Sequence, residues 1–373
     1  MKNQLSLFLF LVSITVALAQ KDDSSNGVYG NKYINAAWGK LDKNKDDTYT
    51  KAEANNERIW NRFSYLDANA NNEISAAEFR KLEIPYLETG GERKLNVLYK
   101  ETDEGNLYLD IYYPKNRTKG QKLPVVVYTH GGGWAAGSRH GASNASFKTV
   151  HTELLNKGFC VVSVSYRLWN KKRTTAMRDC VIDSKDALRY LSKNSKELGV
   201  DPNRFFSFGD SAGGQISQML LLSPPETLLG DAALADYTYT MVAGVSWYGP
   251  SDFEKMSLFN HDDRPNFTDR FEPRILKPDT DPKDKLAFYR EMSPVNYLQK
   301  NSAPLFMIQG DSDTTIPVKH AYYMAKKATE LGAPVTTLII KNAGHNWRRV
   351  ENDIDPTRAS IIQRTIDYFV SHL

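Results

Sequence analysis

Short apolar runs alternate with amphipathic stretches of helical period from about residue 92 to the end of the chain. The first two runs lie close enough to form a hairpin, and the later ones are almost continuously apolar, which is typical of parallel strands buried on both faces. This alternation predicts an α/β fold with a mostly parallel eight-stranded sheet flanked by helices. The expected strands are residues 95–99, 107–112, 125–129, 159–166, 205–209, 244–247, 305–309 and 336–340, and the expected helices are residues 146–157, 174–194, 211–222, 318–331 and 355–370.

Two further segments do not follow this alternation of apolar and amphipathic runs. Residues 251–300 are rich in proline and charge without a clear period, so they are expected to form a cap over the sheet. Residues 33–90 read as a small all-α module interrupted by two polar loops. The expected organisation is a signal peptide at 1–19, a linker at 20–32, the N-terminal module at 33–90 and the α/β domain at 91–373.

The signal peptide is expected because a positively charged start and an apolar run precede the small-residue pattern Ala17-Leu18-Ala19. A secreted, extracellular protein follows, or a periplasmic one in a bacterium. No second segment reaches the roughly 18 consecutive apolar residues of a membrane span, so none is expected. Export makes the sequons at Asn116, Asn144 and Asn266 candidate glycosylation sites.

Net charge and cysteine content exclude few classes of protein. The net charge of +4 comes from 48 basic and 44 acidic residues without a long basic block, which does not favour a nucleic-acid partner. The two cysteines, Cys160 and Cys180, exclude a disulfide scaffold. A bridge between them and two buried free thiols are both open at this point, and so is the oligomeric state.

The candidate nucleophile is Ser211, within the stretch Gly209-Asp210-Ser211-Ala212-Gly213. This G-x-S-x-G pattern lies between an expected strand and an expected helix, the context of a serine held on a tight strand-to-helix turn. Glycines flank such a serine because the turn leaves no room for a Cβ atom. A plain strand-to-helix turn is the alternative, so the serine needs a base and an acid to be a nucleophile.

Both partners follow later in the chain. His345 lies in a glycine-flanked loop after the expected strand 336–340, and Asp311 and Asp313 follow the strand 305–309. The order serine, aspartate, histidine, each beyond the carboxyl end of a strand, is that of a hydrolase triad. Asp313 is preferred as the acid, while Asp311 is expected to cap the turn.

The stretch "HGGGW" follows the strand 125–129 and is the candidate oxyanion hole. The backbone N–H groups of Gly132, Gly133 and Ala212 are expected to stabilise a developing oxyanion, because glycines let the backbone approach a substrate oxygen. His130 is expected to hold the loop. Trp134 is expected to line the substrate pocket, with simple packing as the alternative.

Together "HGGGW", "GDSAGG", "QGDSDTTIP" and "AGHNW" resemble the α/β-hydrolase superfamily. The first two are similar to the hormone-sensitive-lipase-like carboxylesterases, and "WYGPSDF" is similar to secreted acetyl xylan or feruloyl esterases. The resemblance covers residues from about 92 to the C-terminus and implies an α/β-hydrolase fold. It also implies catalysis by Ser211, Asp313 and His345. Asp183 resembles a structural position and is expected to pair with Arg167 or Arg189.

The two polar loops of the N-terminal module match the twelve-residue EF-hand loop, whose oxygen ligands suit Ca²⁺. Glycine normally occupies the sixth position; Asp47 and Asn72 stand there instead, and Asn tolerates the left-handed backbone better than Asp does. A structural or docking role for Ca²⁺ is expected, and two metal-free polar turns are the alternative. The expected ligands are Asp42, Asn44, Asp46, Thr48 and Glu53 in the first loop, and Asp67, Asn69, Asn71, Glu73 and Glu78 in the second.

These patterns predict a secreted serine esterase that forms an acyl-enzyme and needs no cofactor for catalysis. Its expected substrates are short acyl esters, including small molecules and acyl groups on extracellular polysaccharides. The alternatives are a lipase or peptidase of the same fold, or a catalytically silent hydrolase-like module used for calcium-dependent binding or adhesion.

Overall fold

The computed structural model describes residues 41–54, 60, 67, 71–75, 78, 86–87, 89–118 and 120–373. The chain divides into two compact units, Met1–Tyr86 and Leu87–Leu373. The expected signal peptide and linker lie outside the described residues, as do Asn69 and most of the helix expected between the two polar loops.

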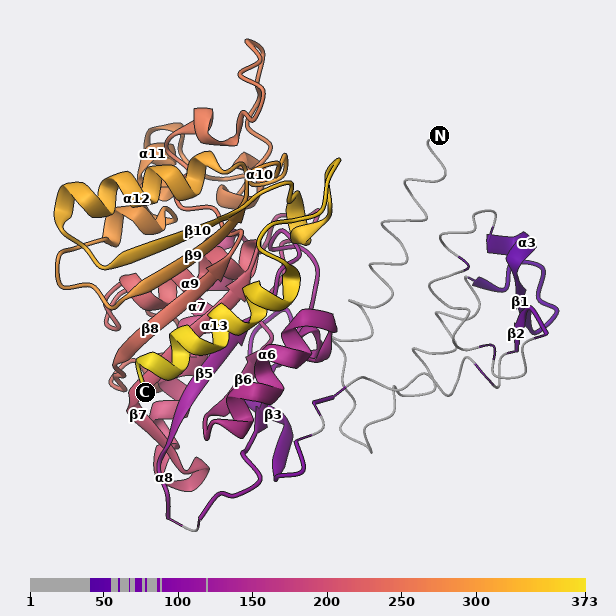
Figure 1. The fold of residues 1–373 in the computed structure, drawn as a ribbon, viewed down its shortest axis with the longest axis horizontal. Helices are drawn as coiled ribbons and strands as arrows, with labels where there is room; N and C mark the ends of the chain where they lie inside the picture. Colours follow the sequence, from indigo (N-terminus) through magenta and orange to yellow (C-terminus); the bar gives the residue numbers. More distant parts are fainter. Residues whose placement is uncertain are drawn as a thin grey trace. The chain divides into compact units, whose positions relative to one another are not determined.

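The larger unit is built on one eight-stranded sheet (Figure 1). Its order is β10-β9-β8-β7-β5-β6-β4-β3, and β4 runs antiparallel to both of its neighbours while β5 to β10 are parallel. The mostly parallel eight-stranded sheet is therefore confirmed. The strands are β3 (Arg93–Lys100), β4 (Leu107–Tyr112), β5 (Leu123–Thr129), β6 (Cys160–Val164), β7 (Val200–Asp210), β8 (Met241–Trp247), β9 (Leu305–Gly310) and β10 (Val335–Ile340).

Strand β7 begins five residues before the expected position. Its polar start, residues 201–204, contains Pro202 and forms an irregularity against β5, since Leu123 pairs with Val200 and Val125 already pairs with Phe205. Proline and polar residues are depleted in buried strands, so the apolar pattern marked only the regular part.

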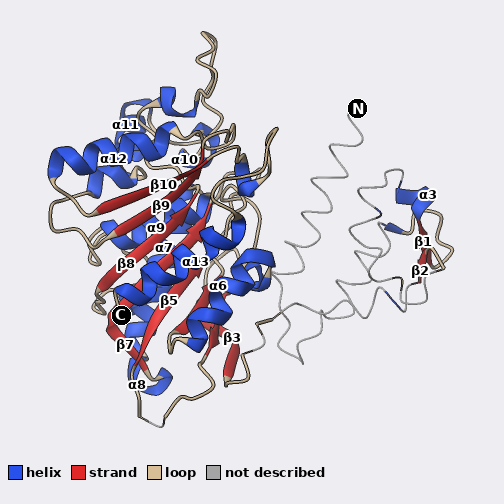
Figure 2. Ribbon diagram, viewed as in Figure 1, coloured by secondary structure: helices blue, strands red, loops and turns tan. Residues whose placement is uncertain are grey.

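Helices cover both faces of the sheet (Figure 2). Helices α6 and α13 pack against each other on one face, and α7 and α9 lie together on the opposite one. The main helices begin and end within three residues of the expected limits, and the short α8 was not expected. They are α6 (Ala145–Asn156), α7 (Met177–Lys193), α8 (Ser195–Leu198), α9 (Ala212–Leu222), α12 (Lys319–Leu331) and α13 (Arg358–Ser371).

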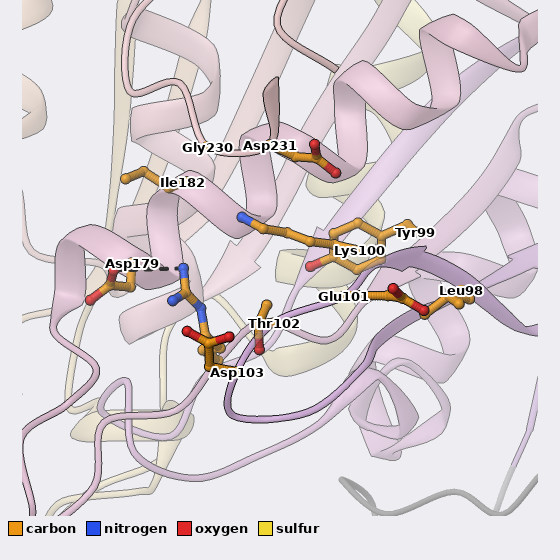
Figure 3. A pocket seen from close by; sticks show the side chains of 11 residues that line it. Leu98, Tyr99, Lys100, Glu101, Thr102, Asp103, Asp179, Ile182, Gly230 and Asp231 are labelled. Carbon is orange, nitrogen blue, oxygen red and sulfur yellow. Dashed lines mark ion pairs between the residues drawn. The ribbon is translucent and has the colours of Figure 1, made fainter. Parts of the chain in front are cut away.

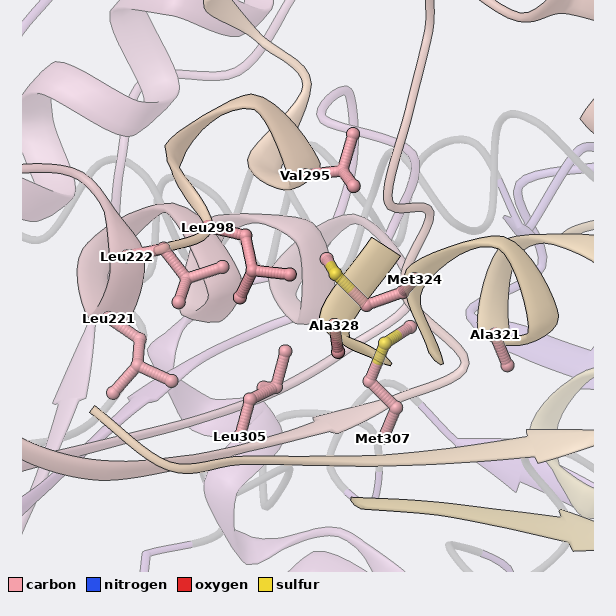
Figure 4. Packing of buried hydrophobic residues seen from close by; sticks show 9 residues of the cluster. All are labelled: Leu221, Leu222, Val295, Leu298, Leu305, Met307, Ala321, Met324 and Ala328. Carbon is pink, nitrogen blue, oxygen red and sulfur yellow. The ribbon is translucent and has the colours of Figure 1, made fainter. Parts of the chain in front are cut away.

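Alternation along β9 explains how both faces are filled. Leu305 and Met307 point into an apolar cluster with Met324 of α12 and Leu221 of α9, shown in Figure 4. Phe306, between them, instead packs against Tyr368 of α13 with ring centroids 5.0 Å apart. Successive residues of a strand face opposite sides, so a run of apolar residues binds helices on both faces.

The expected cap consists of short helices joined by loops. They are η4 (Met256–Phe259), α10 (Glu272–Ile275), η5 (Pro282–Asp284), α11 (Lys285–Glu291) and η6 (Pro294–Tyr297). Pro273, Pro282 and Pro294 stand in the first turns of three of them, where a proline costs no helical hydrogen bond.

Two smaller expectations are settled in the described part of the chain. Cys160 and Cys180 are buried free thiols and form no disulfide. Asp183 pairs with Arg167 at 2.7 Å and also with Lys100 at 2.7 Å, whereas Arg189 pairs with Asp186. None of the helices described combines the length and the apolar character needed to cross a lipid bilayer.

Candidate active site

Ser211 occupies the sharp turn between β7 and α9. Its backbone has φ 52° and ψ −118°, a conformation that L-residues adopt only under strain. A Cβ atom on Gly209 would lie 2.1 Å from the carbonyl oxygen of Gly213, and one on Gly213 would lie 2.0 Å from that of Thr129. The turn therefore requires both glycines, and it lifts the serine to the carboxyl end of β7.

The structure brings the three candidate catalytic side chains together. His345 Nε2 lies 3.0 Å from Ser211 Oγ, and His345 Nδ1 lies 2.7 Å from Asp313 Oδ2. The three residues follow the carboxyl ends of β7, β9 and β10, which meet at one edge of a parallel sheet. A proton can therefore pass from the hydroxyl to an imidazole that the carboxylate holds in orientation.

The Asp313 carboxylate is buried and held by several donors. Its Oδ1 accepts from the backbone N–H groups of Thr315 and Ile316 at 2.8 and 2.9 Å. Its Oδ2 accepts from Gln309 Nε2 at 3.1 Å in addition to the imidazole. Asp311, by contrast, is exposed and accepts from the Ser312 hydroxyl. Burial and these contacts assign the orienting position to Asp313.

Two neighbours of the triad were missed at the level of sequence. Gln309 is the one polar side chain in the apolar strand β9, which was the available signal. Tyr248 places its ring 4.8 Å from the His345 imidazole, edge on, and has a strained φ of 42°. Burial raises the pKa of Tyr248 well above its usual value, so the phenol stays neutral. Tyr248 limits how far the imidazole can turn, and Gln309 holds the carboxylate that orients it.

The glycine loop lies directly beside the nucleophile. The N–H of Gly131 donates to Asp210 Oδ1 at 2.8 Å, and the Tyr128 hydroxyl donates to the same oxygen at 2.9 Å. Gly132 has φ 123°, and a Cβ there would lie 2.1 Å from the carbonyl oxygen of Ala136. Glycine is therefore required at this position, and the residue preceding Ser211 anchors the loop.

The expected oxyanion donors are available in this arrangement. Among the described residues, no acceptor is recorded for the N–H groups of Gly132, Gly133 and Ala212. Ala212 is the first residue of α9, where the helix dipole adds positive potential. These N–H groups are free to bind an oxygen that gains negative charge.

Buried ionisable groups support the loop without taking part in proton transfer. Burial lowers the pKa of His130 to about 4, and its ring stacks on Tyr166 at 4.3 Å. Burial also raises the pKa of Asp210 to about 6, against the hydrogen bonds from Tyr128 and Gly131. His130 is thus a neutral structural residue at pH 7, as expected.

The expectation that Trp134 lines the substrate pocket is wrong for this structure. Its side chain is 1% exposed, its Nε1 donates to Gln215 at 3.1 Å, and its ring meets Phe253 and Phe271 edge on. Because its N–H has an acceptor and its ring is enclosed, the indole packs behind the glycine loop and does not face a substrate. The sequence placed it near the site but could not show which way it faces.

A cap residue contacts the glycine loop directly. Arg274 donates a hydrogen bond to the carbonyl oxygen of Gly133, and its guanidinium lies 4.3 Å from the Trp169 ring. Trp169 in turn donates from its backbone N–H to the Trp134 carbonyl at 2.7 Å and from its Nε1 to the Pro273 carbonyl at 2.5 Å. These contacts tie the cap to the loop that carries the oxyanion donors.

Two cavities of the larger unit are formed by described residues, and neither is lined by Ser211. The larger, about 800 Å³, is bounded by the turn after β3, helix α7 and Gly230–Asp231 (Figure 3). It is mostly polar, and both of its lining cations are paired: Lys100 contacts Asp183 and Asp186 at 2.7 and 2.6 Å, and Arg167 contacts Asp183 at 2.7 Å. A second cavity of about 390 Å³ lies beside Thr314, the neighbour of the catalytic acid.

In the smaller unit, the two polar loops meet as a short two-stranded sheet. Strand β1 (Thr48–Thr50) pairs antiparallel with β2 (Glu73–Ser75), and Tyr49 lies opposite Ile74. The all-α expectation for this unit omitted this sheet. The sixth positions of both loops, Asp47 and Asn72, have φ of 63° and 65°, the left-handed conformation for which that position normally carries glycine.

The first loop fits Ca²⁺ by the chemistry of its donors. Asp42, Asn44, Asp46 and Glu53 supply the hard oxygens that the ion prefers, and Glu53 Oε1 is a buried oxygen without a hydrogen-bond donor among the described residues. The carboxylates now accept bonds from loop N–H groups, such as Asp47 N–H to Asp42 Oδ2 at 3.0 Å. In the described residues, no three Asp, Glu, His or Cys side chains converge on one point.

The second loop repeats this pattern in the residues that the structure describes. The N–H groups of Asn71 and Asn72 donate to Asp67, and Glu73 N–H donates to Asn71 Oδ1. Glu78, at the twelfth position, accepts from Ser75. Asn69 lies outside the described residues.

Comparison with known proteins identifies relatives of the larger unit. Residues 109–328 match the family model BD-FAE. The probable carboxylic ester hydrolase LipM of Mycobacterium tuberculosis is 26% identical over 227 residues, which cover 61% of this chain and 49% of LipM. Rabbit liver carboxylesterase 1 is 37% identical over 138 residues, covering 35% of this chain and 23% of that protein. The chain thus spans about half the length of the first of these curated relatives, and less of the second.

Solved structures show the same fold. Esterase 2 of Thermogutta terrifontis, in a form phosphonylated by sarin, aligns with a TM-score of 0.60 at 23% identity. The alignment covers 78% of this chain and 97% of that one. The butyrate-bound form of the same esterase aligns with a TM-score of 0.59 at 22% identity, covering 76% and 94%.

Proposed function

Because the chain belongs to the BD-FAE family, whose matched region carries the nucleophile turn and the glycine loop, we propose that it is a serine carboxylic ester hydrolase. The observation that carries this proposal is the continuous path from Ser211 Oγ through the His345 imidazole to the Asp313 carboxylate, at 3.0 and 2.7 Å. The names of the relatives, which are esterases and carboxylesterases, support it.

In the first half of the reaction, Ser211 Oγ attacks the ester carbonyl carbon while His345 Nε2 takes the hydroxyl proton. The carbonyl oxygen gains negative charge, which the N–H groups of Gly132, Gly133 and Ala212 stabilise. One such donor is worth roughly 3 kcal/mol of transition-state stabilisation. The bond to the alcohol oxygen then breaks, the imidazolium returns the proton to that oxygen, and an acyl-enzyme remains.

In the second half, water takes the place of the alcohol. His345 removes a proton from the water, whose oxygen attacks the acyl carbon, and the proton returns to Ser211 Oγ as the acid leaves. The chemistry needs no metal ion or organic cofactor. Asp313 keeps the imidazole in the tautomer that accepts at Nε2 throughout.

We further propose that the protein is secreted and acts on short acyl esters, including acyl groups of extracellular polysaccharides. The expected signal peptide and the likeness to secreted polysaccharide esterases support this proposal. A lipase favours an apolar lid, whereas the cap of this chain is charged, with ion pairs such as Lys285–Glu272 and Arg290–Glu254 on its surface. The charged cap therefore favours the esterase over the lipase alternative.

We also propose that the N-terminal unit binds Ca²⁺ in a structural or docking role. Asp42, Asn44, Asp46 and Glu53 would hold the ion in the first loop with the backbone carbonyl of Thr48, and Asp67, Asn69, Asn71 and Glu78 in the second with that of Glu73. The left-handed backbone at Asp47 and Asn72 supports the proposal. The ion would neutralise the carboxylates of the two loops and would take no part in ester cleavage.

The decisive experiment for ester hydrolysis is the release of p-nitrophenol from p-nitrophenyl acetate. A burst equal to the enzyme concentration, absent in Ser211→Ala, is expected because an acyl-enzyme forms before water attacks. A binding or adhesion module with this fold would release no p-nitrophenol, and that result would overturn the proposal.

A further inference from the structure

The cavity beside the catalytic acid is built differently from the rest of the cap. Its volume of about 390 Å³ lies within the range of small-molecule sites. Phe259 and Phe267 give it aromatic walls, and Thr314 joins it to the loop of Asp313. Arg264 and Arg270 supply two positive charges to its lining. An aromatic wall with a guanidinium beside it suits a ring that carries a carboxylate.

The two arginines differ in how their charge is compensated. Arg264 pairs with Asp262 at 2.8 Å. Within the described residues, no carboxylate lies within ion-pair distance of Arg270, which is exposed and donates to the carbonyl oxygen of Thr315. Partial burial lowers the pKa of Arg270, and the charge of nearby Asp313 opposes that shift. Arg270 therefore keeps donors available for an anionic group.

The position of Arg270 relates this charge to the reacting ester. Its guanidinium holds the loop of the catalytic acid, and the next residue, Phe271, meets the Trp134 ring edge on at 5.7 Å, just behind the glycine loop. Helix α10 (Glu272–Ile275) continues from there to Arg274 and the Gly133 carbonyl. The segment thus runs between the acid loop and the oxyanion loop.

The chemistry of ester cleavage indicates which part of the substrate would reach the cavity. The departing alcohol oxygen takes its proton from His345 Nε2, so the alcohol part lies on the histidine side of Ser211. His345 is held by Asp313, and the next residue in the chain, Thr314, lines the cavity. On this path through the acid loop, the alcohol part would be the part of the substrate that reaches Arg270.

We propose that this cavity is a subsite for a carboxylate on the alcohol part of the substrate, so that the enzyme prefers acyl esters of sugar chains that carry uronic acid residues. Arg270 would bind the carboxylate, and Phe259 and Phe267 would contact the ring of the sugar. This inference rests on the proposed ester hydrolysis and names its substrate class.

The test compares acetylated glucuronoxylan with the same polymer after reduction of its carboxyl groups. The two polymers differ only at the carboxylate, which becomes a hydroxymethyl group on reduction, so the ratio of their kcat/KM values isolates the subsite. A ratio of about tenfold in favour of the acidic polymer is expected for one charged hydrogen-bonded pair near the surface. Arg270→Gln should bring the ratio close to one, and dividing by the neutral polymer cancels any general loss of activity.

A matched control removes a positive charge elsewhere on the cap. Lys283 is 76% exposed and pairs with Asp281, away from the cavity lining. Lys283→Gln should keep the preference for the acidic polymer. Since Asn266 lines the cavity and lies in a sequon, the protein should be produced without N-glycans. A preference that is absent in the wild type, or unchanged in Arg270→Gln, would overturn the proposal.

Two further measurements keep the proposal separate from ester hydrolysis itself. Hydrolysis of p-nitrophenyl acetate, which has no carboxylate, reports the chemistry alone. If that activity is absent, calorimetry with methyl glucuronoside against methyl glucoside still tests the subsite, because only the first should bind in an Arg270-dependent way. A preference for p-nitrophenyl hemisuccinate over the butyrate that depends on Arg270 would place the carboxylate on the acyl part and overturn the assignment to the alcohol.

Discussion

His345 Nε2 lies 3.0 Å from the hydroxyl oxygen of Ser211, although the two residues are 134 positions apart in the chain. Each stands just beyond the carboxyl end of its own parallel strand, β7 for the serine and β10 for the histidine. Strands β8 and β9 lie between these two in the sheet, so loops of some length must reach across the edge. The contact between Ser211 and His345 therefore depends on the order of strands in the whole sheet. Substitutions at single positions test the role of each residue in this arrangement.

Replacing Ser211 by alanine should reduce kcat for p-nitrophenyl acetate by at least about 10³-fold, because the attacking oxygen is lost. The oxyanion donors remain, so a small rate above that of water is expected. The thermal midpoint should change little, since alanine keeps the Cβ atom and the strained backbone at φ 52°, and only the hydroxyl contact with His345 is lost. Retention of most of the activity would assign the nucleophile elsewhere.

Replacing Asp313 by asparagine should lower kcat about 10⁴-fold and leave KM nearly unchanged. An amide can donate to His345 Nδ1 and would hold the imidazole in the wrong tautomer. Asp311→Asn is the control, because its side chain contacts Ser312 rather than the imidazole. Equal losses in the two variants would contradict the assignment of the acid.

The buried carboxyl of Asp210 should make stability depend on pH. Burial raises its pKa from 3.8 to about 6, so between these values the folded state binds more protons than the unfolded state. Stability therefore falls as the pH rises from about 4 to above 6, by up to about 3 kcal/mol. Asp210→Asn should remove this loss and gain stability relative to the wild type at pH 7.5.

Urea unfolding at pH 4.5 and 7.5 measures this difference. The advantage of Asp210→Asn should be larger at the higher pH, while the exposed Asp353→Asn should change little at either. A difference between variant and wild type that does not change with pH would show that Asp210 stays ionised in the fold.

Arg274 should act as a positioning residue for the glycine loop. Arg274→Ala removes the hydrogen bond to the Gly133 carbonyl and the stacking on Trp169, so kcat should fall about tenfold with a smaller change in KM. Arg274→Lys should restore part of kcat, because an ammonium can still donate to the carbonyl. A change confined to KM would instead indicate a direct role in substrate binding.

Calcium should raise the thermal midpoint of the protein, and chelation by EDTA should lower it. Glu53→Gln and Glu78→Gln should weaken binding most, since the twelfth position supplies two oxygens to the ion. Extracellular sites of this kind bind at about 10⁻⁴–10⁻³ M, so calorimetric titration should use millimolar calcium. Glu197→Gln, on the exposed surface of the larger unit, is the control. No heat and no shift of the midpoint in the wild type would contradict binding.

Local chemistry made much of this protein predictable from sequence. The period of apolar residues predicted all eight strands of the main sheet. The inner strands β5, β6 and β9 were the clearest, because burial on both faces demands continuous apolar runs. Glycine at 209, 213 and 132 marked turns in which the backbone leaves no space for a Cβ atom. Apolar residues of buried strands and glycines of tight turns could therefore be located before the fold was known, because a local physical requirement sets their identity.

Contacts between residues far apart in the sequence were decided only by the tertiary structure. Trp134 packs against Gln215, Phe253 and Phe271, and Arg274 binds the Gly133 carbonyl, over separations of 81 to 141 positions. Arg270, which has no carboxylate partner among the described residues, reaches the acid loop from the aperiodic cap. No local pattern records such contacts, because a side chain's direction depends on which segments the sheet order places around it. The sequence determined which groups are available for chemistry, and the folded sheet decided which of them face one another.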